Sequence, residues 1–139
     1  MGTVVRSEIS KKNKYWIEKH RYYELKHFCL QYPIWKKAYF ALDGLSRNSS
    51  SLIKIQDTNE INNPTERCAE SKIFYSRLTE IIERAAIDTD KLLSTYILKA
   101  VTEGLTYDYL KSRLEIPCCR DTYYELYRKF FWILNHARN

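Results

Sequence analysis

The amino-acid sequence predicts an all-α protein, and three observations favour this class. Apolar side chains recur at spacings of three and four residues through most of the chain, as they do on one face of an α-helix. Only three Gly and three Pro occur in 139 residues, whereas all-β proteins need many turns. Twelve Tyr, five Phe and three Trp supply large side chains for a hydrophobic core.

The N-terminal part, residues 1–43, is predicted to form a helical hairpin. The first helix is expected over residues 11–31 and should end before Pro33, which cannot continue it. Its apolar stripe consists of Tyr15, Tyr22, Leu25, Phe28, Cys29 and Tyr32. The helical spacing resumes over residues 34–42.

Residues 44–62 are predicted to be a flexible linker. They contain Gly44, a serine run and several Asn and Asp residues, without a sustained apolar period. A loop of this length inside a compact domain is unusual, so we expect it to separate the hairpin from the remainder of the chain.

The C-terminal part, residues 63–139, is predicted to be a helical domain. Asn63 followed by Pro64 and Glu66 is typical of a helix start, so a helix is expected from 64 to about 87. A second helix should end at about Glu103, with Gly104 in a left-handed conformation behind it. The side chains expected to face inward on these two helices are Cys68, Phe74, Leu78, Ile81, Ile82, Ala85, Leu92, Leu93, Tyr96, Ile97, Ala100 and Val101.

Residues 105–136 have the pattern of a helix-turn-helix. Thr106 should cap a short helix, Ile116 should be buried in the turn, and Thr122 with Glu125 should form a capping box for a longer helix. In such a motif the second helix, here from about 121, enters the DNA major groove. The candidate DNA-binding residues are Thr106, Lys111, Arg113, Arg120, Asp121, Tyr124, Glu125, Arg128 and Lys129. Arg can donate two hydrogen bonds to guanine and Glu can accept one from cytosine, whereas Lys111, Arg113 and Lys129 are expected to contact phosphates. The same pattern also fits an ordinary helical hairpin with a charged outer face.

This segment resembles the helix-turn-helix of sigma factor region 4, whose usual form is G-L-S-Y-x-E-I-A-x-x-L-G-I-S-x-x-T. The matching residues are Gly104, Leu105, Thr106, Tyr107, Leu110, Leu114, Ile116 and Thr122. Two features differ: Glu115 replaces the turn glycine, and the stretch from Ile116 to Thr122 is two residues longer than usual. The layout, with Tyr32-Pro33, a linker and the Asn63–Glu66 helix start, is similar to RinA/ArpU-type phage transcriptional regulators. That resemblance implies an activator of late or packaging genes.

Charge and composition indicate the partners. The formal net charge is +6, with nine basic and four acidic residues in 1–43, six and eight in 44–90, and eight and five in 91–139. A basic balance favours double-stranded DNA as the partner. For a regulator of the kind that the resemblance implies, host RNA polymerase and a second copy of the chain in a homo-oligomer are further candidate partners. We expect neither a secretory signal nor a membrane span, because no apolar run approaches the roughly 18 residues required, and hence a cytoplasmic location.

Other functions remain open alternatives at this stage. A small terminase-like DNA-binding subunit would also use a helix-turn-helix, and a protein-interaction module that inhibits a host protein would use the aromatic helices of residues 15–42. No enzyme activity and no cofactor are expected, because phosphate-binding loops and nucleophile motifs are absent from the sequence. No metal site is expected from Cys29, Cys68, Cys118 and Cys119, whose spacing does not suit zinc.

Overall fold

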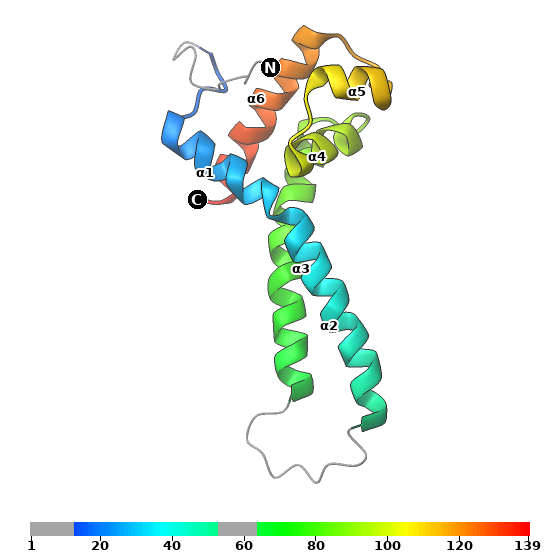
Figure 1. Ribbon diagram of the computed structural model, residues 1–139. Coiled ribbons are helices and arrows are strands. Elements are labelled where there is room, and N and C mark those ends of the chain that lie inside the picture. The colour runs from blue at the N-terminus through cyan, green and yellow to red at the C-terminus, as the bar shows by residue number, and fades with distance from the viewer. Residues whose placement is uncertain (1–12, 53–63) are drawn as a thin grey trace. The chain divides into compact units, whose positions relative to one another are not determined.

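The computed structural model describes residues 13–52 and 64–139, and side chains over residues 13–44 and 66–139. Its elements are all helical: α1 (Lys19–Leu30), α2 (Tyr32–Leu52), α3 (Pro64–Thr89), α4 (Ser94–Glu103), α5 (Tyr107–Arg113) and α6 (Arg120–Ala137) (Figure 1). No strand occurs in these ranges, so the predicted all-α class is confirmed. None of the helices in the described part of the chain has the length and apolar character needed to cross a bilayer.

The chain divides into two units. The first contains the residues up to Tyr32 together with Ile81–Asn139, and the second is Pro33–Glu80. This division differs from the one predicted at residues 44–62, because α2 and the first half of α3 pair with each other and form a unit of their own.

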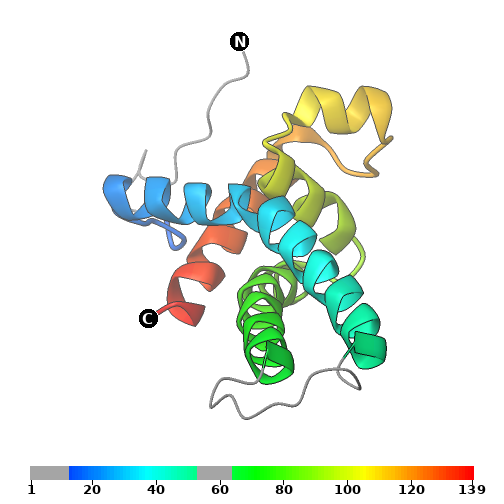
Figure 2. The same ribbon diagram turned by 60° about the horizontal axis from the view of Figure 1, so that its bottom comes forward.

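The first unit has a core in which α1 packs against α4 and α6, and α4 packs against α6 (Figure 2). Aromatic side chains join α1 to α6. The ring of Tyr22 lies 5.2 Å from that of Phe131 and its hydroxyl lies 2.7 Å from that of Tyr127. The side chains of this core with no exposed surface are Tyr22, Leu25, Cys29, Ile82, Leu110, Ile116, Phe130 and Leu134. Burial raises the pKa of Tyr127 well above its ordinary value and raises that of the Cys29 thiol.

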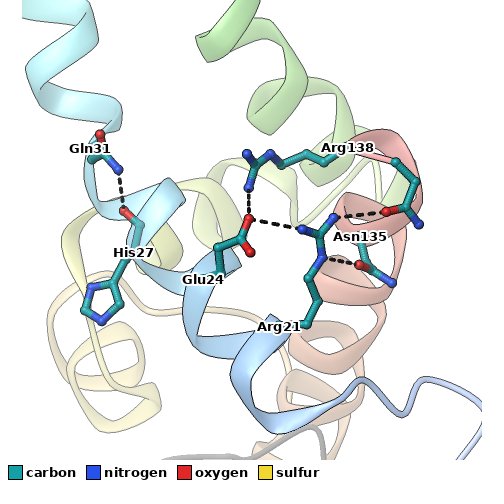
Figure 3. A network of polar contacts seen from close by, with 7 residues as sticks. Arg21, Glu24, His27, Gln31, Asn135 and Arg138 are labelled. Carbon is teal, nitrogen blue, oxygen red and sulfur yellow. Dashed lines mark hydrogen bonds and ion pairs between the residues drawn. The ribbon is translucent and has the colours of Figure 1, made fainter.

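A polar network closes the edge of the α1–α6 contact (Figure 3). Arg21 donates to Asn135 Oδ1 at 2.6 Å and to Glu24 Oε1 at 3.0 Å. Arg138 also donates to Glu24 Oε1 at 3.0 Å, and its guanidinium lies 4.0 Å from the ring centre of Phe28. The C-terminal end of α6 is therefore attached to α1 by both charge and packing.

Helix α1 begins later than predicted. Residues 13–16 form a turn in which Asn13 Oδ1 accepts from the Tyr15 N–H at 2.9 Å and the Asn13 carbonyl accepts from the Trp16 N–H at 3.0 Å. An Asn side chain that bonds the backbone two residues ahead competes with helix formation. The start predicted at residues 11–12 lies outside the described residues. The predicted interruption at Pro33 is confirmed, since α1 ends at Leu30 and Pro33 is the second residue of α2.

The second unit is a pair of helices, α2 and the first half of α3. Lys72 Nζ lies 2.7 Å from Asp43 Oδ1, and the Cys68 thiol donates to the Leu42 carbonyl at 3.2 Å. The prediction of a linker from residue 44 was wrong over residues 44–52, which continue α2, while residues 53–62 lie outside the described residues. Ser and Asn cost only about 0.5–0.7 kcal/mol each in a helix, a penalty that contact with a neighbouring helix can offset.

Two side chains predicted to face inward are exposed instead. Leu92 is 89% exposed, because the Asp90 carboxylate accepts from the N–H groups of Leu92 and Leu93 and forms a turn there. Helix α4 therefore begins at Ser94. Phe74 is 58% exposed, since a two-helix unit covers only one side of α3. The predicted start at Pro64 and the left-handed Gly104, with φ 69°, are confirmed.

Candidate nucleic-acid interface

Helix α5 starts as the sequence predicts and is short, with seven residues that end at Arg113. Thr106 has an extended backbone, and its hydroxyl accepts from the Tyr109 N–H at 3.2 Å, which satisfies one of the free donors of the first turn. Tyr107 and Leu110 face inward, and Leu110 has no exposed surface. The Thr106 hydroxyl thus already accepts a hydrogen bond from the helix backbone, although the residue is exposed.

The turn after α5 is fixed by Ile116, which is fully buried as predicted. Its N–H bonds to the Leu110 carbonyl at 3.1 Å. The Tyr107 hydroxyl donates to the Cys118 carbonyl at 2.7 Å, so the far end of the turn is also attached to α5. Glu115 adopts a left-handed backbone with φ 54°, a conformation that favours glycine.

Helix α6 begins at Arg120 with Cys119 as its N-cap residue. The capping box predicted at Thr122 and Glu125 was therefore wrong, because Thr122 lies inside the first turn of the helix. The Thr122 hydroxyl lies 3.1 Å from Cys119 Sγ, and its hydrogen bond lowers the pKa of the Cys119 thiol. Burial raises the pKa of the neighbouring Cys118 thiol. Cysteine is not among the usual capping residues, so the sequence offered no signal for this start.

Arg120 connects α6 to α5. Its guanidinium forms an ion pair with Asp108, donates to the Tyr124 hydroxyl at 3.3 Å and lies 5.3 Å from the ring centre of Tyr107. The carboxylate of Asp108 raises the pKa of Arg120, which stays positively charged. Of the predicted DNA-binding residues, Arg120 therefore has the largest number of partners within the protein itself.

The other candidate residues lie on the outer faces of α5 and α6. Lys111 and Arg113 are exposed on α5, and Lys111 Nζ lies 3.4 Å from the Ile116 carbonyl oxygen. On α6, Asp121 and Glu125 are exposed, and Tyr124, Arg128 and Lys129 are half-buried. The opposite side of α6 is buried through Tyr123, Phe130, Phe131 and Leu134. The structure thus brings the candidates from both helices onto one helix-turn-helix and leaves one side of α6 accessible.

Sequence reasoning missed Asp108 and Cys119. Asp108 is an acidic residue in the first turn of α5, where its negative charge interacts favourably with the positive end of the helix dipole. No local sequence pattern connects it with Arg120, which lies twelve positions later. The two helices and the turn between them carry five basic residues, including Arg120, and four acidic ones, Asp108, Glu115, Asp121 and Glu125. This surface is therefore charged and mixed in sign.

The chain matches no protein-family model, no curated protein sequence and no solved structure.

Proposed function

We propose that this protein is a sequence-specific DNA-binding transcriptional regulator of the phage type, which reads the major groove with α6. The observation that carries the proposal is the short helix α5, the turn closed by buried Ile116, and the longer helix α6 with one side free. The N-terminal residues of the second helix make the base contacts in helix-turn-helix proteins. Here those residues include Asp121, Tyr124 and Glu125, followed one turn later by Arg128.

The backbone of the turn supports the resemblance to sigma factor region 4. The family pattern has a glycine where this chain has Glu115, and Glu115 takes the left-handed conformation that glycine would provide. The pattern also has a helix-starting Ser followed three residues later by Thr. Cys119 occupies that N-cap position and Thr122 follows it by three residues. The two additional residues are then Pro117 and Cys118, within the turn and ahead of the recognition helix.

A role in activating late or packaging genes, and contact with host RNA polymerase, extend the proposal on the basis of the family resemblance. The net charge of +6 supports a polyanionic partner, because neutralising phosphates releases counterions and contributes affinity for any sequence. Specificity must then come from the few side chains of α6 that reach base edges.

The experiment that tests the proposal is a binding selection of the full chain against random duplex DNA, read by sequencing. We expect one enriched motif, and binding to it that weakens steeply between about 50 and 200 mM salt. Absence of binding at low salt would contradict any DNA-binding function and would favour a protein-interaction module. Binding without an enriched motif would contradict sequence-specific reading.

Two variants separate base reading from phosphate contact. Arg128→Ala should cost about 1–3 kcal/mol on the selected motif and little on scrambled duplexes, if its guanidinium contacts a guanine. Lys111→Ala should weaken all duplexes similarly and reduce the salt slope by about one unit. Lys19→Ala, which removes one exposed positive charge from α1, is the matched control. Arg128→Ala that binds both duplexes as the parent does would exclude Arg128 as a base contact.

Arg120 requires a separate experiment because Asp108 holds it. We expect Arg120 to be a positioning residue, so Asp108→Asn and Arg120→Ala should weaken binding to a similar degree, and the double variant should cost no more than either single variant. If Asp108→Asn leaves binding unchanged while Arg120→Ala abolishes it, Arg120 contacts DNA directly.

A further inference from the structure

The first half of α3 has an exposed face in the second unit that carries both apolar and charged side chains. Seven exposed residues lie on it at helical spacing: Glu66, Arg67, Glu70, Ile73, Phe74, Arg77 and Glu80. Ile73 is 52% and Phe74 58% exposed. The opposite side of this helix carries Cys68 and Lys72, which contact α2.

The charges on this face form no ion pair with the side chains that the structure describes. Among the residues whose side chains the structure describes, none of Glu66, Arg67, Glu70, Arg77 and Glu80 forms an ion pair. Lys72, on the other side of the same helix, is paired with Asp43. The unpaired charges therefore coincide with the face that α2 does not cover.

The order of four of these five charges is self-complementary in the antiparallel direction, whereas Glu66 falls opposite Ile81 and has no charged counterpart. A point midway between Ile73 and Phe74 lies equally far from Glu70 and Arg77, and equally far from Arg67 and Glu80. A second copy of the helix, turned by a two-fold axis through that point, places Glu70 opposite Arg77 and Arg67 opposite Glu80. A parallel copy in register would place each charge opposite an identical one, which is repulsive.

We propose that two copies of this chain associate through this face of α3, antiparallel about a two-fold axis between Ile73 and Phe74. Each Ile73 meets the Phe74 of the other copy at the centre, and four ion pairs flank this contact. A groove of about 500 Å³ borders this face. Its lining is both apolar, from Tyr39, Ala69 and Ile73, and polar, from Lys72, Ser76, Arg77 and Glu80, so it offers a second copy apolar and charged groups together. The matched charge order favours a second copy as the occupant of this face, since an identical, reversed helix places each of these four charges opposite one of the other sign.

The test is sedimentation equilibrium of charge-reversed variants without DNA, so its outcome is independent of the proposed function. The parent chain should have twice the mass of one chain. Glu70→Arg and Arg77→Glu should each raise the dimer dissociation constant at least about tenfold, because like charges then face each other. The double variant E70R/R77E should dimerise as the parent does. An equal mixture of the two single variants should also recover dimers, since the positive face of one then meets the negative face of the other.

Controls separate this face from general effects of charge. Glu103→Arg, a reversal at an exposed position of α4 in the first unit, should leave the dissociation constant unchanged. Phe74→Ser introduces no charge and should weaken the dimer while circular dichroism shows an intact fold. A monomeric parent chain, single reversals that leave the dimer intact, or a mixture that stays monomeric would each overturn the proposal.

Discussion

The two units of this protein differ in how many of their own side chains each one buries. The first unit surrounds an aromatic core in which Tyr22, Phe130 and Phe131 are almost completely enclosed. In the second unit, Trp35 and Thr79 are the only buried side chains among those described, while Ile34, Phe40, Ile73 and Phe74 are exposed. Two helices can cover only one stripe of each other, whereas α1, α4 and α6 enclose a volume.

This difference indicates where stability and association reside. All the buried side chains in the described part of the chain except Trp35 and Thr79 belong to the first unit, and helices α5 and α6 are part of the same core. The second unit gains less from burial and keeps apolar and charged groups available for another surface. Substitutions of the same chemistry in the two units should therefore have unequal effects on the free energy of unfolding.

The largest contrast is expected between two phenylalanines. Phe131 is 1% exposed, and its ring contacts those of Tyr22, Tyr127 and Phe130. Phe131→Ala should lower the free energy of unfolding by about 3–5 kcal/mol. Phe74→Ala, measured by the same urea titration at a concentration where the chain is monomeric, should change it by less than about 0.5 kcal/mol. Equal losses would show that the second unit contributes as much to folding as the first.

The next effect concerns the hydrogen bond between the hydroxyls of Tyr22 and Tyr127, 2.7 Å apart. Tyr127→Phe should cost about 1–3 kcal/mol, because the Tyr22 hydroxyl is then buried without this partner. The double variant Y22F/Y127F should cost less than the sum of the two single variants. Tyr75→Phe in the second unit, where the side chain is half-buried, is the matched control. Additive losses would mean that the two hydroxyls are not coupled.

The buried hydroxyl of Tyr127 predicts an alkaline limit to stability. Burial raises the pKa of Tyr127 above its ordinary value of 10.0, so the neutral form is favoured in the folded state. A raised pKa contributes stability that is complete below the unfolded pKa and is lost as the pH rises above it. The free energy of unfolding should therefore fall as the pH rises above about 10, and less so in Y22F/Y127F. A parent chain whose stability does not change in this range would contradict the burial of these hydroxyls.

A smaller change in the free energy of unfolding, here an increase, is expected for a substitution at Glu115. Its φ of 54° is unfavourable for a residue with a side chain, so Glu115→Gly should stabilise the chain by about 0.5–1 kcal/mol. Lys111→Gly, an exposed position in the interior of α5, should instead lose about 1 kcal/mol. Thermal unfolding of both variants measures these changes in stability. A less stable Glu115→Gly variant would show that the Glu115 side chain makes a contact that outweighs its backbone strain.

The smallest effect is expected in the network that closes the α1–α6 contact (Figure 3). Glu24 accepts from both Arg21 and Arg138, but its side chain is 54% exposed. Glu24→Gln should cost only about 0.2–1 kcal/mol, and the loss should shrink in high salt. A loss that does not depend on salt would show that packing, rather than charge, connects these helices.

Several parts of the fold were predictable because their signals are local. Pro64 at a helix start, Thr106 as a cap and Gly104 behind a helix each act through the backbone within one turn. The burial of Ile116 also follows from an apolar residue in a short turn between two helices. The sequence by itself therefore determined the all-α class, the start of α5 and the position of the turn before α6.

Only the tertiary structure decided the features that depend on distant partners. The Asp43–Lys72 pair and the Leu42–Cys68 contact connect α2 to α3, beside a stretch whose serines and asparagines predicted a linker. The first turn of α6 holds Arg120 against Asp108 of α5, and no local pattern encodes that pair. Phe74 fits the apolar spacing of a buried position and is exposed because its unit has no third helix to cover it. Periodicity shows which side chains share a face, but the number of neighbouring helices decides whether that face is buried.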